Sequence, residues 1–193
     1  MRVIGGVAKR VQLTAPKGAN TRPTSDRAKE GLFNIVSTRV PGSNFLDLFC
    51  GSGAVGIEAL SRGASFAAFV DHSPKAIAAL KQNLEKTRLG HMAWHLCVKA
   101  DAAIDKFAKE KSIFDIIFLD PPYGGDLLAD TLCRIAVSGV LSAGGIIIAE
   151  TDTKSVDNIP SSLYLYDTRV YGLGKLMFYE YRRLDEACLS GKF

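Results

Sequence analysis

A tetrapeptide with the chemistry to grip an amine follows one of the most apolar segments of the chain. Asp120, Pro121, Pro122 and Tyr123 come directly after the run 114–119, and two fixed φ angles make this corner stiff. The Asp120 carboxylate and the Pro121 backbone carbonyl could accept hydrogen bonds from a planar NH₂ group. Such bonds would draw the nitrogen lone pair out of conjugation and stabilise the developing positive charge. Tyr123 could stack on the ring that carries the amine.

A glycine-rich loop lies upstream, directly after the apolar run 44–49. Residues 51–56 read Gly-Ser-Gly-Ala-Val-Gly, the GxGxxG pattern of a strand-to-helix junction at which the backbone approaches a nucleotide-like cofactor. Gly51, Ser52 and Gly53 are therefore candidate cofactor contacts. Two adjacent prolines alone would fit an ordinary surface turn, but the two motifs together favour methylation of an amine.

Three aspartates stand where the strands of a parallel sheet would end. Asp71 lies twenty residues after Gly51 and suits hydrogen bonds from ribose hydroxyls, in an NAD enzyme or a methyltransferase alike. Asp101 could accept from an adenine amine, or only cap the next helix, just as Asp71 could only begin a turn. Asp47 decides between cofactors, because a carboxylate beside the loop repels a pyrophosphate but attracts an amino group and a sulfonium. This favours S-adenosylmethionine.

Short apolar runs separated by helical patterns must position these residues. Nearly continuous apolar strands indicate a parallel α/β sheet that is covered on both faces. The five predicted strands are 44–49, 65–70, 93–98, 114–119 and 145–150. Two further segments, 162–172 and 175–183, flank Leu173-Gly174 and predict an antiparallel hairpin at the far edge of a seven-stranded sheet.

Amphipathic patterns predict helices between these strands and one before them. Ser73 followed by Pro74 is typical of a helix start, and the helix should cover 74–87. Other helical patterns cover 54–63, 102–110 and 126–137. The segment 25–39, with Ser25 as its cap, is expected to place five apolar side chains on one face: Ala28, Leu32, Phe33, Ile35 and Val36. Residues 1–20 resemble a small hairpin or arm.

Positive charge is concentrated at one end of the chain. The net charge is +4, but residues 1–40 hold eight Lys or Arg against two acids, and the remainder is −2. Such asymmetry suggests a polyanionic partner, although a solvated basic arm is an equal alternative on charge alone. We expect a basic N-terminal extension over 1–40, a Rossmann-like domain over 41–185 and a C-terminal tail over 186–193.

Composition excludes several classes of protein. A chain of 193 residues with 47% hydrophobic and 23% charged residues is an ordinary globular domain. No apolar run has the roughly 18 residues of a membrane-spanning helix, and early charges argue against a signal peptide. The cysteines lack CxxC spacing, so we expect reduced thiols, no metal and a cytoplasmic protein. Nothing demands more than a monomer, and the three histidines receive no role.

With these motifs in view, the chain resembles the RsmD family, the bacterial 16S ribosomal RNA guanine-N2 methyltransferases. The resemblance covers nearly the whole chain. Its most specific part is Thr21-Arg22-Pro23-Thr24-Ser25-Asp26-Arg27, then Glu30 and Leu32-Phe33-Asn34, which is similar to the family's RPTxxRxxExLFN element. The segments DLFCGSGAVGIEALSRGA and FDIIFLDPPYGG are similar to its cofactor loop and catalytic strand.

The resemblance implies a Rossmann-like class I methyltransferase with a basic N-terminal extension that contacts the RNA. It implies cofactor contacts by Asp47, Gly51, Gly53, Asp71 and Asp101. It implies contact with the guanine by Asp120, Pro121 and Tyr123. The basic residues expected to meet RNA are Arg2, Lys9, Arg10, Lys17, Arg22 and Arg27.

The N-terminal element departs from the family's pattern at three positions. Ala28-Lys29 and Gly31 stand where Val-Arg and Thr are expected, and a helical glycine costs about 1 kcal/mol relative to alanine. These departures concern RNA contacts, not the catalytic residues. Arg22, Thr24 and Arg27 could face either the cofactor or the RNA, and an ion pair between Arg27 and Glu30 is an equal alternative.

Other activities remain open at this point. The Asp120 tetrapeptide also resembles those of adenine-N6 methyltransferases of DNA or RNA, and related tetrapeptides serve protein-glutamine methylation. A glycine loop alone would also suit an NAD-dependent oxidoreductase, and a basic RNA-binding module with an inactive pocket is a third class. The leading prediction is transfer of a methyl group to the guanine N2 amine of 16S ribosomal RNA, within the 30S subunit or an assembly intermediate.

Overall fold

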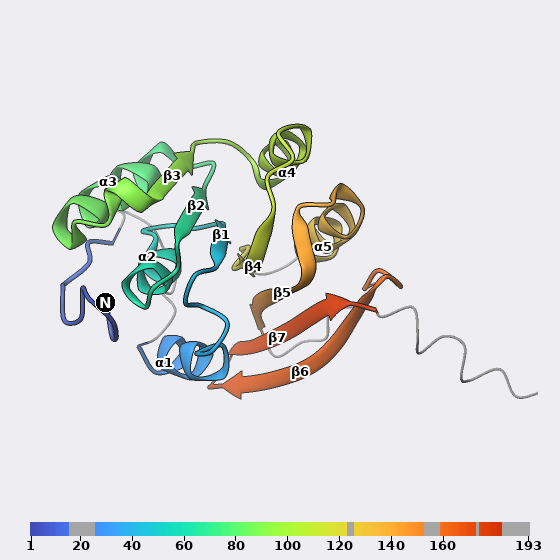
Figure 1. The fold of residues 1–193 in the computed structure, drawn as a ribbon, viewed down its shortest axis with the longest axis horizontal. Helices are drawn as coiled ribbons and strands as arrows, with labels where there is room; N and C mark the ends of the chain where they lie inside the picture. Colours follow the sequence, from blue (N-terminus) through green and yellow to red (C-terminus); the bar gives the residue numbers. More distant parts are fainter. Residues whose placement is uncertain (16–25, 123–125, 153–158, 173, 183–193) are drawn as a thin grey trace, which may run out of the picture.

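The strands form a single mixed sheet. The computed structural model describes residues 1–15, 26–122, 126–152, 159–172 and 174–182. Within these ranges the strand order is β3-β2-β1-β4-β5-β7-β6, with β7 antiparallel to both neighbours (Figure 1). The bounds are β1 (Asn44–Leu48), β2 (Phe66–Val70), β3 (Ala93–Leu96), β4 (Phe114–Leu119), β5 (Leu141–Asp152), β6 (Leu163–Tyr171) and β7 (Gly174–Tyr181).

The predicted strands and the C-terminal hairpin are confirmed, although all strands except β4 differ from the predicted bounds by one or more residues. β5 begins at Leu141 rather than Gly145, and its pairing with β4 shifts register between Phe114 and Ile116. The shift lies where Gly144 adopts a φ of +80°, which side chains other than glycine rarely tolerate. β3 ends at Leu96, two residues earlier than expected, because the chain then leaves the sheet.

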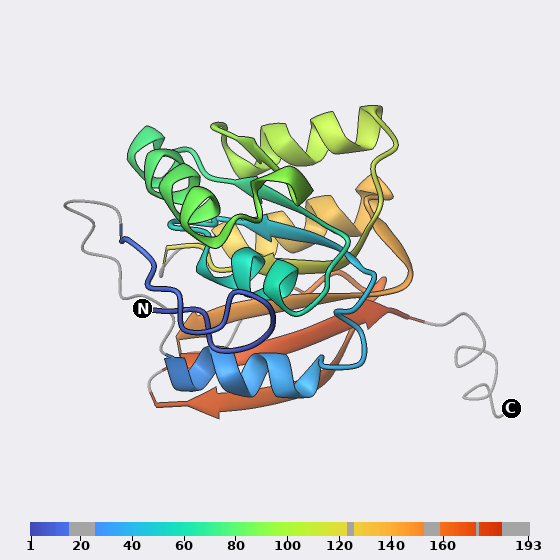
Figure 2. The same ribbon diagram turned by 60° about the vertical axis from the view of Figure 1, so that its left-hand side comes forward.

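Helices cover both faces of the sheet, as continuous apolar strands require (Figure 2). Buried side chains of α1, α2 and α3 pack on one face, and those of α4 and α5 on the other. The bounds are α1 (Asp26–Ile35), α2 (Ala54–Ser61), α3 (Pro74–Thr87), α4 (Ala100–Lys109) and α5 (Leu127–Ser138). The predicted start of α3 is confirmed, since the Ser73 hydroxyl accepts from the Ala76 N–H.

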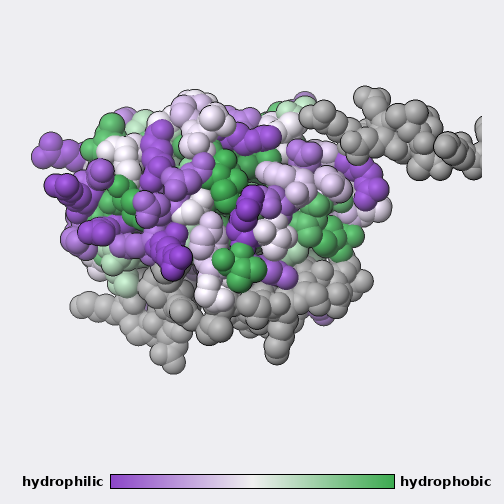
Figure 3. All heavy atoms as spheres, turned by 90° about the horizontal axis from the view of Figure 1, so that it is seen from below, coloured by the Kyte–Doolittle hydropathy of each residue, from purple (hydrophilic) through white to green (hydrophobic). Residues whose placement is uncertain are grey.

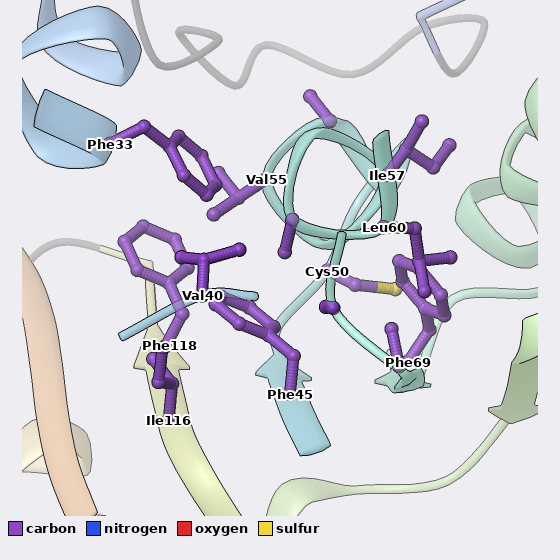
Figure 4. Packing of buried hydrophobic residues seen from close by; sticks show 14 of the residues in the cluster. Phe33, Val40, Phe45, Cys50, Val55, Ile57, Leu60, Phe69, Ile116 and Phe118 are labelled. Carbon is purple, nitrogen blue, oxygen red and sulfur yellow. The ribbon is translucent and has the colours of Figure 1, made fainter. Parts of the chain in front are cut away.

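The first of the two cores joins the helix α1 to the sheet. Phe33 of α1 faces Val55 of α2, while Phe45 of β1 and Phe118 of β4 fill the space beneath them (Figure 4). All four side chains are buried. This packing places α2, which follows the glycine loop, against both the sheet and α1.

The predicted apolar face of α1 is wrong at one position, Ile35. Ile35 is 37% exposed, while Lys29 is fully buried. The reason is an ion pair, because Lys29 Nζ lies 3.2 Å from the buried Glu58 carboxylate of α2. That pair turns the Ala28-Lys29-Leu32-Phe33 stripe of the helix inward and leaves Ile35 outside it.

Residues 1–15, called the N-terminal arm below, fold back on themselves and pack against the same core. Arg2 and Gln12 form an antiparallel bridge, and the Val3, Ala8 and Leu13 side chains are buried with those of α1 and α2. Predicted residues 16–20 lie outside the described part of the chain.

The molecular surface carries hydrophobic side chains singly rather than in a large patch on the face shown in Figure 3. Exposed large hydrophobic residues such as Val7, Val137 and Val170 come from different elements, which is ordinary for a folded protein. Among the described residues, no helix is both long and apolar enough to span a bilayer.

Candidate functional site

Four acidic side chains follow one another along the carboxyl edge of the sheet. Asp71 follows β2, Asp47 lies in β1, Asp120 follows β4 and Glu150 lies in β5, and these strands are consecutive in the sheet. Leu119 pairs with Ala149, so Asp120 and Glu150 come next on adjacent strands. This set is called the carboxylate row below. It concentrates negative potential where ligands of open α/β sheets bind.

Asp47 lies deepest in the row. Its side chain is 1% exposed and one carboxylate oxygen accepts from the Gly56 N–H at 2.9 Å. Burial raises the pKa of Asp47 from 3.8 to about 7, and the negative charge of Asp71 adds to the increase. A buried carboxylate with one hydrogen bond gains strongly from a nearby cation.

The last glycine of the loop allows this contact. A Cβ on Gly56 would lie 2.4 Å from the Phe69 ring and 3.1 Å from the Asp47 carboxylate. Only a residue without a side chain lets the first turn of α2 approach β1 so closely.

Asp71 shapes the loop from the neighbouring strand. One of its oxygens accepts from the Gly51 N–H at 2.9 Å, and the other accepts from the Ser73 N–H at 2.8 Å. Asp71 therefore connects the glycine loop to the start of α3. The bond from the Ser73 N–H is the turn that the sequence offered as an alternative role for Asp71. Gly51 has a φ of +53° and open space where a side chain would be, so its backbone is accessible to a ligand.

The rest of the loop is tightly packed. Gly53 caps α2 in the left-handed conformation, and a Cβ there would lie 2.3 Å from Leu80. Ser52 is buried. Phe49, just before the loop, has a φ of +66°, an uncommon conformation for a large residue, and such conformations concentrate at functional sites.

Asp120 ends β4 beside the row. Burial raises its pKa well above the usual value, and the charges of Glu150 and then Asp47 raise it further. Pro121 is buried and Pro122 exposed, so the corner turns from the sheet into solvent between them. Tyr123 lies outside the described residues.

A cavity of about 980 Å³ opens next to this edge, a size typical of sites for small ligands. Its lining includes Phe49, Asp71, His72, Lys99 and Asp101, and its far wall comes from α4 and α5. Asp101 is exposed in the first turn of α4 and accepts from the Ala102 N–H. The cavity thus brings Asp71 and Asp101 together, whereas Asp47 and the glycines lie outside its lining.

The predicted RNA contacts lie mostly at the surface. Arg2 pairs with Asp26 at 3.3 Å, and Lys9, Arg10 and Arg27 are exposed. Arg27 and Glu30 form no ion pair with each other in the described structure. Lys17, Arg22 and Thr24 lie outside the described residues.

Sequence patterns did not single out Glu150, Asn83 or the pair of Lys29 and Glu58. A signal existed for two of them, because Asn83 takes an apolar position in the α3 stripe and Glu58 interrupts the apolar helix α2. Glu150 looked like the polar end of a strand. His72, which was given no role, lines the cavity.

The residues present fit S-adenosylmethionine. Its amino group and sulfonium are cationic, and the carboxylate row supplies negative charge at the loop that would hold it. Gly51 offers an accessible backbone, and Asp71 and Asp101 offer acceptors in the cavity. No cluster of three or more His, Cys, Asp or Glu suited to a metal occurs among the described residues.

Comparison with known proteins finds relatives that are named as methyltransferases. The family described as "Conserved hypothetical protein 95" matches residues 1–180. A Bacillus subtilis protein named "Putative rRNA methyltransferase YlbH" is 39% identical over 94% of this chain and 100% of its own. The Escherichia coli "Ribosomal RNA small subunit methyltransferase D" is 31% identical over 89% of this chain and 85% of its own.

Solved structures agree on the fold. The structure titled "Putative methyltransferase yhhF from Escherichia coli" has a TM-score of 0.82 and 31% identity, over 94% of this chain and 97% of that one. The predicted Rossmann-like class I methyltransferase fold is thus confirmed, with its parallel core and C-terminal antiparallel hairpin. With a family match over nearly its full length, the chain belongs to the RsmD family.

Proposed function

We propose that this protein transfers the methyl group of S-adenosylmethionine to the exocyclic N2 amine of a guanine in small-subunit ribosomal RNA. The observation that carries the proposal is the carboxylate row, which runs from the glycine loop to the stiff corner at Asp120. A cation-binding edge beside an amine-gripping corner is what this reaction needs. Relatives named as ribosomal RNA methyltransferases support the substrate class.

Each end of the row has a separate task in this proposal. When bound, S-adenosylmethionine supplies a methyl carbon activated by a positively charged sulfur. Asp47 and Asp71 hold the cationic ligand and the loop. Asp120 and the Pro121 carbonyl accept from the two amine N–H groups and so direct the nitrogen lone pair outward. As the N–C bond forms and the S–C bond breaks, the amine must lose a proton, and we assign Asp120 to receive it.

The raised pKa of Asp120 suits this task. Burial and two neighbouring carboxylates make its ionised form a stronger proton acceptor than an ordinary aspartate. The methyl group needs no nucleophile from the protein, because the amine itself attacks.

The choice of guanine rests on the N-terminal element that resembles the family. Adenine-N6 methylation is the second candidate, because the corner at Asp120 would hold either amine. The test is to incubate the protein with labelled S-adenosylmethionine and 30S subunits, and then to digest the RNA to nucleosides. We expect label in 2-methylguanosine; label in N6-methyladenosine, or in no nucleoside at all, would overturn the proposal.

Asp120→Ala tests the mechanism. We expect normal binding of S-adenosylhomocysteine by calorimetry and a loss of transfer of roughly 10²- to 10⁴-fold. Asp126→Ala is the control, since this exposed carboxylate makes no capping hydrogen bond at the start of α5. Unchanged turnover in Asp120→Ala would disprove its role.

A further inference from the structure

Asn83 joins the N-terminal arm to the cofactor loop. This α3 side chain is completely buried. Its Oδ1 accepts from the Thr14 N–H at 2.7 Å, while its Nδ2 donates to the Thr14 carbonyl and to the Ser52 carbonyl, each at 2.9 Å. Both N–H groups of one amide are thus used, one on the arm and one on the GxGxxG loop.

The geometry makes the two segments dependent on each other. The oxygen and nitrogen of an amide lie in one fixed plane. If the Asn83 amide rotates to keep its bond to a displaced Ser52, its bonds to Thr14 must therefore move as well. Because no water reaches this buried group, a lost bond is not replaced by a bond to solvent. Displacement of the loop must therefore strain or release the end of the arm.

The other end of the arm is held beside the same loop. The Glu58 carboxylate of α2 accepts from the Ile4 and Gly5 N–H groups at 2.8 and 2.7 Å, and it also pairs with Lys29. α2 begins directly after the loop. Figure 2 shows the arm lying against α2 and near α1. The arm is thus held by α2 at one end and by α3 at the other.

Thr14 stands just before the basic segment. The chain continues into residues 16–25, which carry Lys17 and Arg22, and the arm itself exposes Lys9 and Arg10. Under the proposed function these cations meet RNA phosphates. Asn83 therefore connects the RNA-contacting end of the chain with the cofactor loop.

We propose that Asn83 is a positioning residue through which occupation of the cofactor loop orders the N-terminal arm, so that cofactor and RNA strengthen each other's binding. This inference rests on the proposed function for its RNA half only. The coupling is reciprocal by thermodynamic necessity, so it can be measured from the cofactor side alone.

The first experiment measures amide hydrogen exchange of the wild-type protein with and without saturating S-adenosylhomocysteine. We expect the ligand to slow exchange in peptides from residues 1–14 by about fivefold or more, a typical coupling. If the ligand binds and protects the loop peptide while arm exchange stays the same, the inference is wrong. If the ligand does not bind at all, the cofactor assignment fails instead.

Two variants test Asn83 itself. Asn83→Ala removes all three bonds, and Asn83→Asp keeps the acceptor for Thr14 N–H but turns an oxygen toward two carbonyls. We expect both variants to bind the ligand and protect the loop, with no ligand effect left in the arm. If Asn83 had a purely structural role, both variants would speed arm exchange by the same factor with and without ligand. The ratio of the two exchange rates would then equal that of the wild type, and this result would overturn the proposal.

Two matched controls separate coupling from general destabilisation. Gln82→Ala removes an exposed amide from the neighbouring α3 position. Thr87→Val removes a buried hydroxyl whose bonds go to the Asn83 and Leu84 carbonyls of its own helix. Both should keep the wild-type ratio of arm exchange with and without ligand.

The RNA half is tested by calorimetry with 30S subunits. In the wild-type protein, saturating 30S subunits should lower the Kd of S-adenosylhomocysteine about fivefold, and this factor should fall to one in Asn83→Ala. An equal factor in both proteins would refute the role of Asn83. Formation of 2-methylguanosine by the wild type is measured separately, so failure of the proposed function is recognised independently.

Discussion

Individual carboxylates in the row carry proton affinities set by their neighbours. Asp47 is buried and Asp120 is partly buried. Desolvation raises the pKa of both carboxyls; Asp71 raises that of Asp47 further, and Glu150 and Asp47 raise that of Asp120 further. In the absence of a cationic ligand, Asp47 and Asp120 therefore hold a proton more tightly than ordinary aspartates do. A bound cation reverses that preference, because it stabilises the ionised forms.

Asp47→Asn should change how stability depends on pH. The pKa of Asp47 is raised from 3.8 to about 7 in the folded protein, so the folded state binds its proton more tightly than the unfolded chain does. This contribution is complete below pH 3.8 and is lost as pH rises through 7. Between pH 5 and 8, the wild type without ligand should lose roughly 3 kcal/mol more unfolding free energy than Asp47→Asn in urea titrations. If unfolding free energy changed with pH in the same way in both proteins, the raised pKa of Asp47 would be contradicted.

Glu150→Gln should shift the pH dependence of turnover. Burial and the Glu150 charge raise the pKa of Asp120, and the acid limb of kcat/KM reports ionisation of the proton acceptor in the free enzyme. Removing the Glu150 charge should move that limb to lower pH. Glu180→Gln is the control, since Glu180 pairs with Ile146, four residues before Glu150 in β5. A limb that stays in place would show that another group controls it.

Among the elements, α1 and the C-terminal hairpin meet at a position where the chain departs from its family's pattern. A Cβ on Gly31 would lie 2.2 Å from the Tyr171 hydroxyl oxygen, and Tyr171 packs against the core that includes Leu32 and Phe33. The tyrosine ring occupies the space that the expected threonine would need. The glycine therefore fits the hairpin of this chain, at the expense of helix propensity.

A double-mutant cycle tests this contact. Gly31→Ala should destabilise the protein by about 1–3 kcal/mol because the ring must move. In a Tyr171→Ala background the same change should stabilise it by up to about 1 kcal/mol, the intrinsic preference of a helix for alanine. Urea unfolding of all four proteins gives the coupling, and additive effects would mean that the ring does not restrict position 31.

At the scale of the whole molecule, positive charge and the carboxylate row belong to different parts of the chain. The first 40 residues carry +6 and the rest −2, while the carboxylate row adds a concentrated negative edge. RNA phosphates should be attracted by the arm and repelled by the row, so the arm governs the salt dependence of binding.

Lys9→Gln with Arg10→Gln tests this division. If both side chains contact phosphates, the slope of log affinity for 30S subunits against log salt should fall by roughly 1.4–1.8. The matched control is Lys109→Gln with Lys111→Gln, which removes two exposed charges at the end of α4. Equal slopes for the two double variants would indicate attraction by net charge alone.

Sequence predicts the sheet well because its strands are buried on both faces, so that apolar runs such as 114–119 stand out locally. It also predicts Asp47, Asp71 and Asp120 as candidates, because strand ends and glycine loops are local features. Whether these residues contact ligands stays a prediction.

The remaining features depend on the order of strands and on distant partners. Glu150 acts on Asp120 only because β4 and β5 are neighbours. Lys29 is buried by Glu58, and Asn83 is satisfied by Thr14, 69 positions away. A local pattern cannot distinguish such satisfied polar groups from solvated ones.

The distant anchors of the arm also bear on how the chain folds during synthesis. Thr14 leaves the ribosome 69 residues ahead of Asn83, and Ile4 leaves 54 residues ahead of Glu58. At roughly 5–20 residues per second, the nascent arm waits about 3–14 seconds for its last anchor. Throughout that interval its cations are free to meet the nearest polyanion, which is the translating ribosome itself.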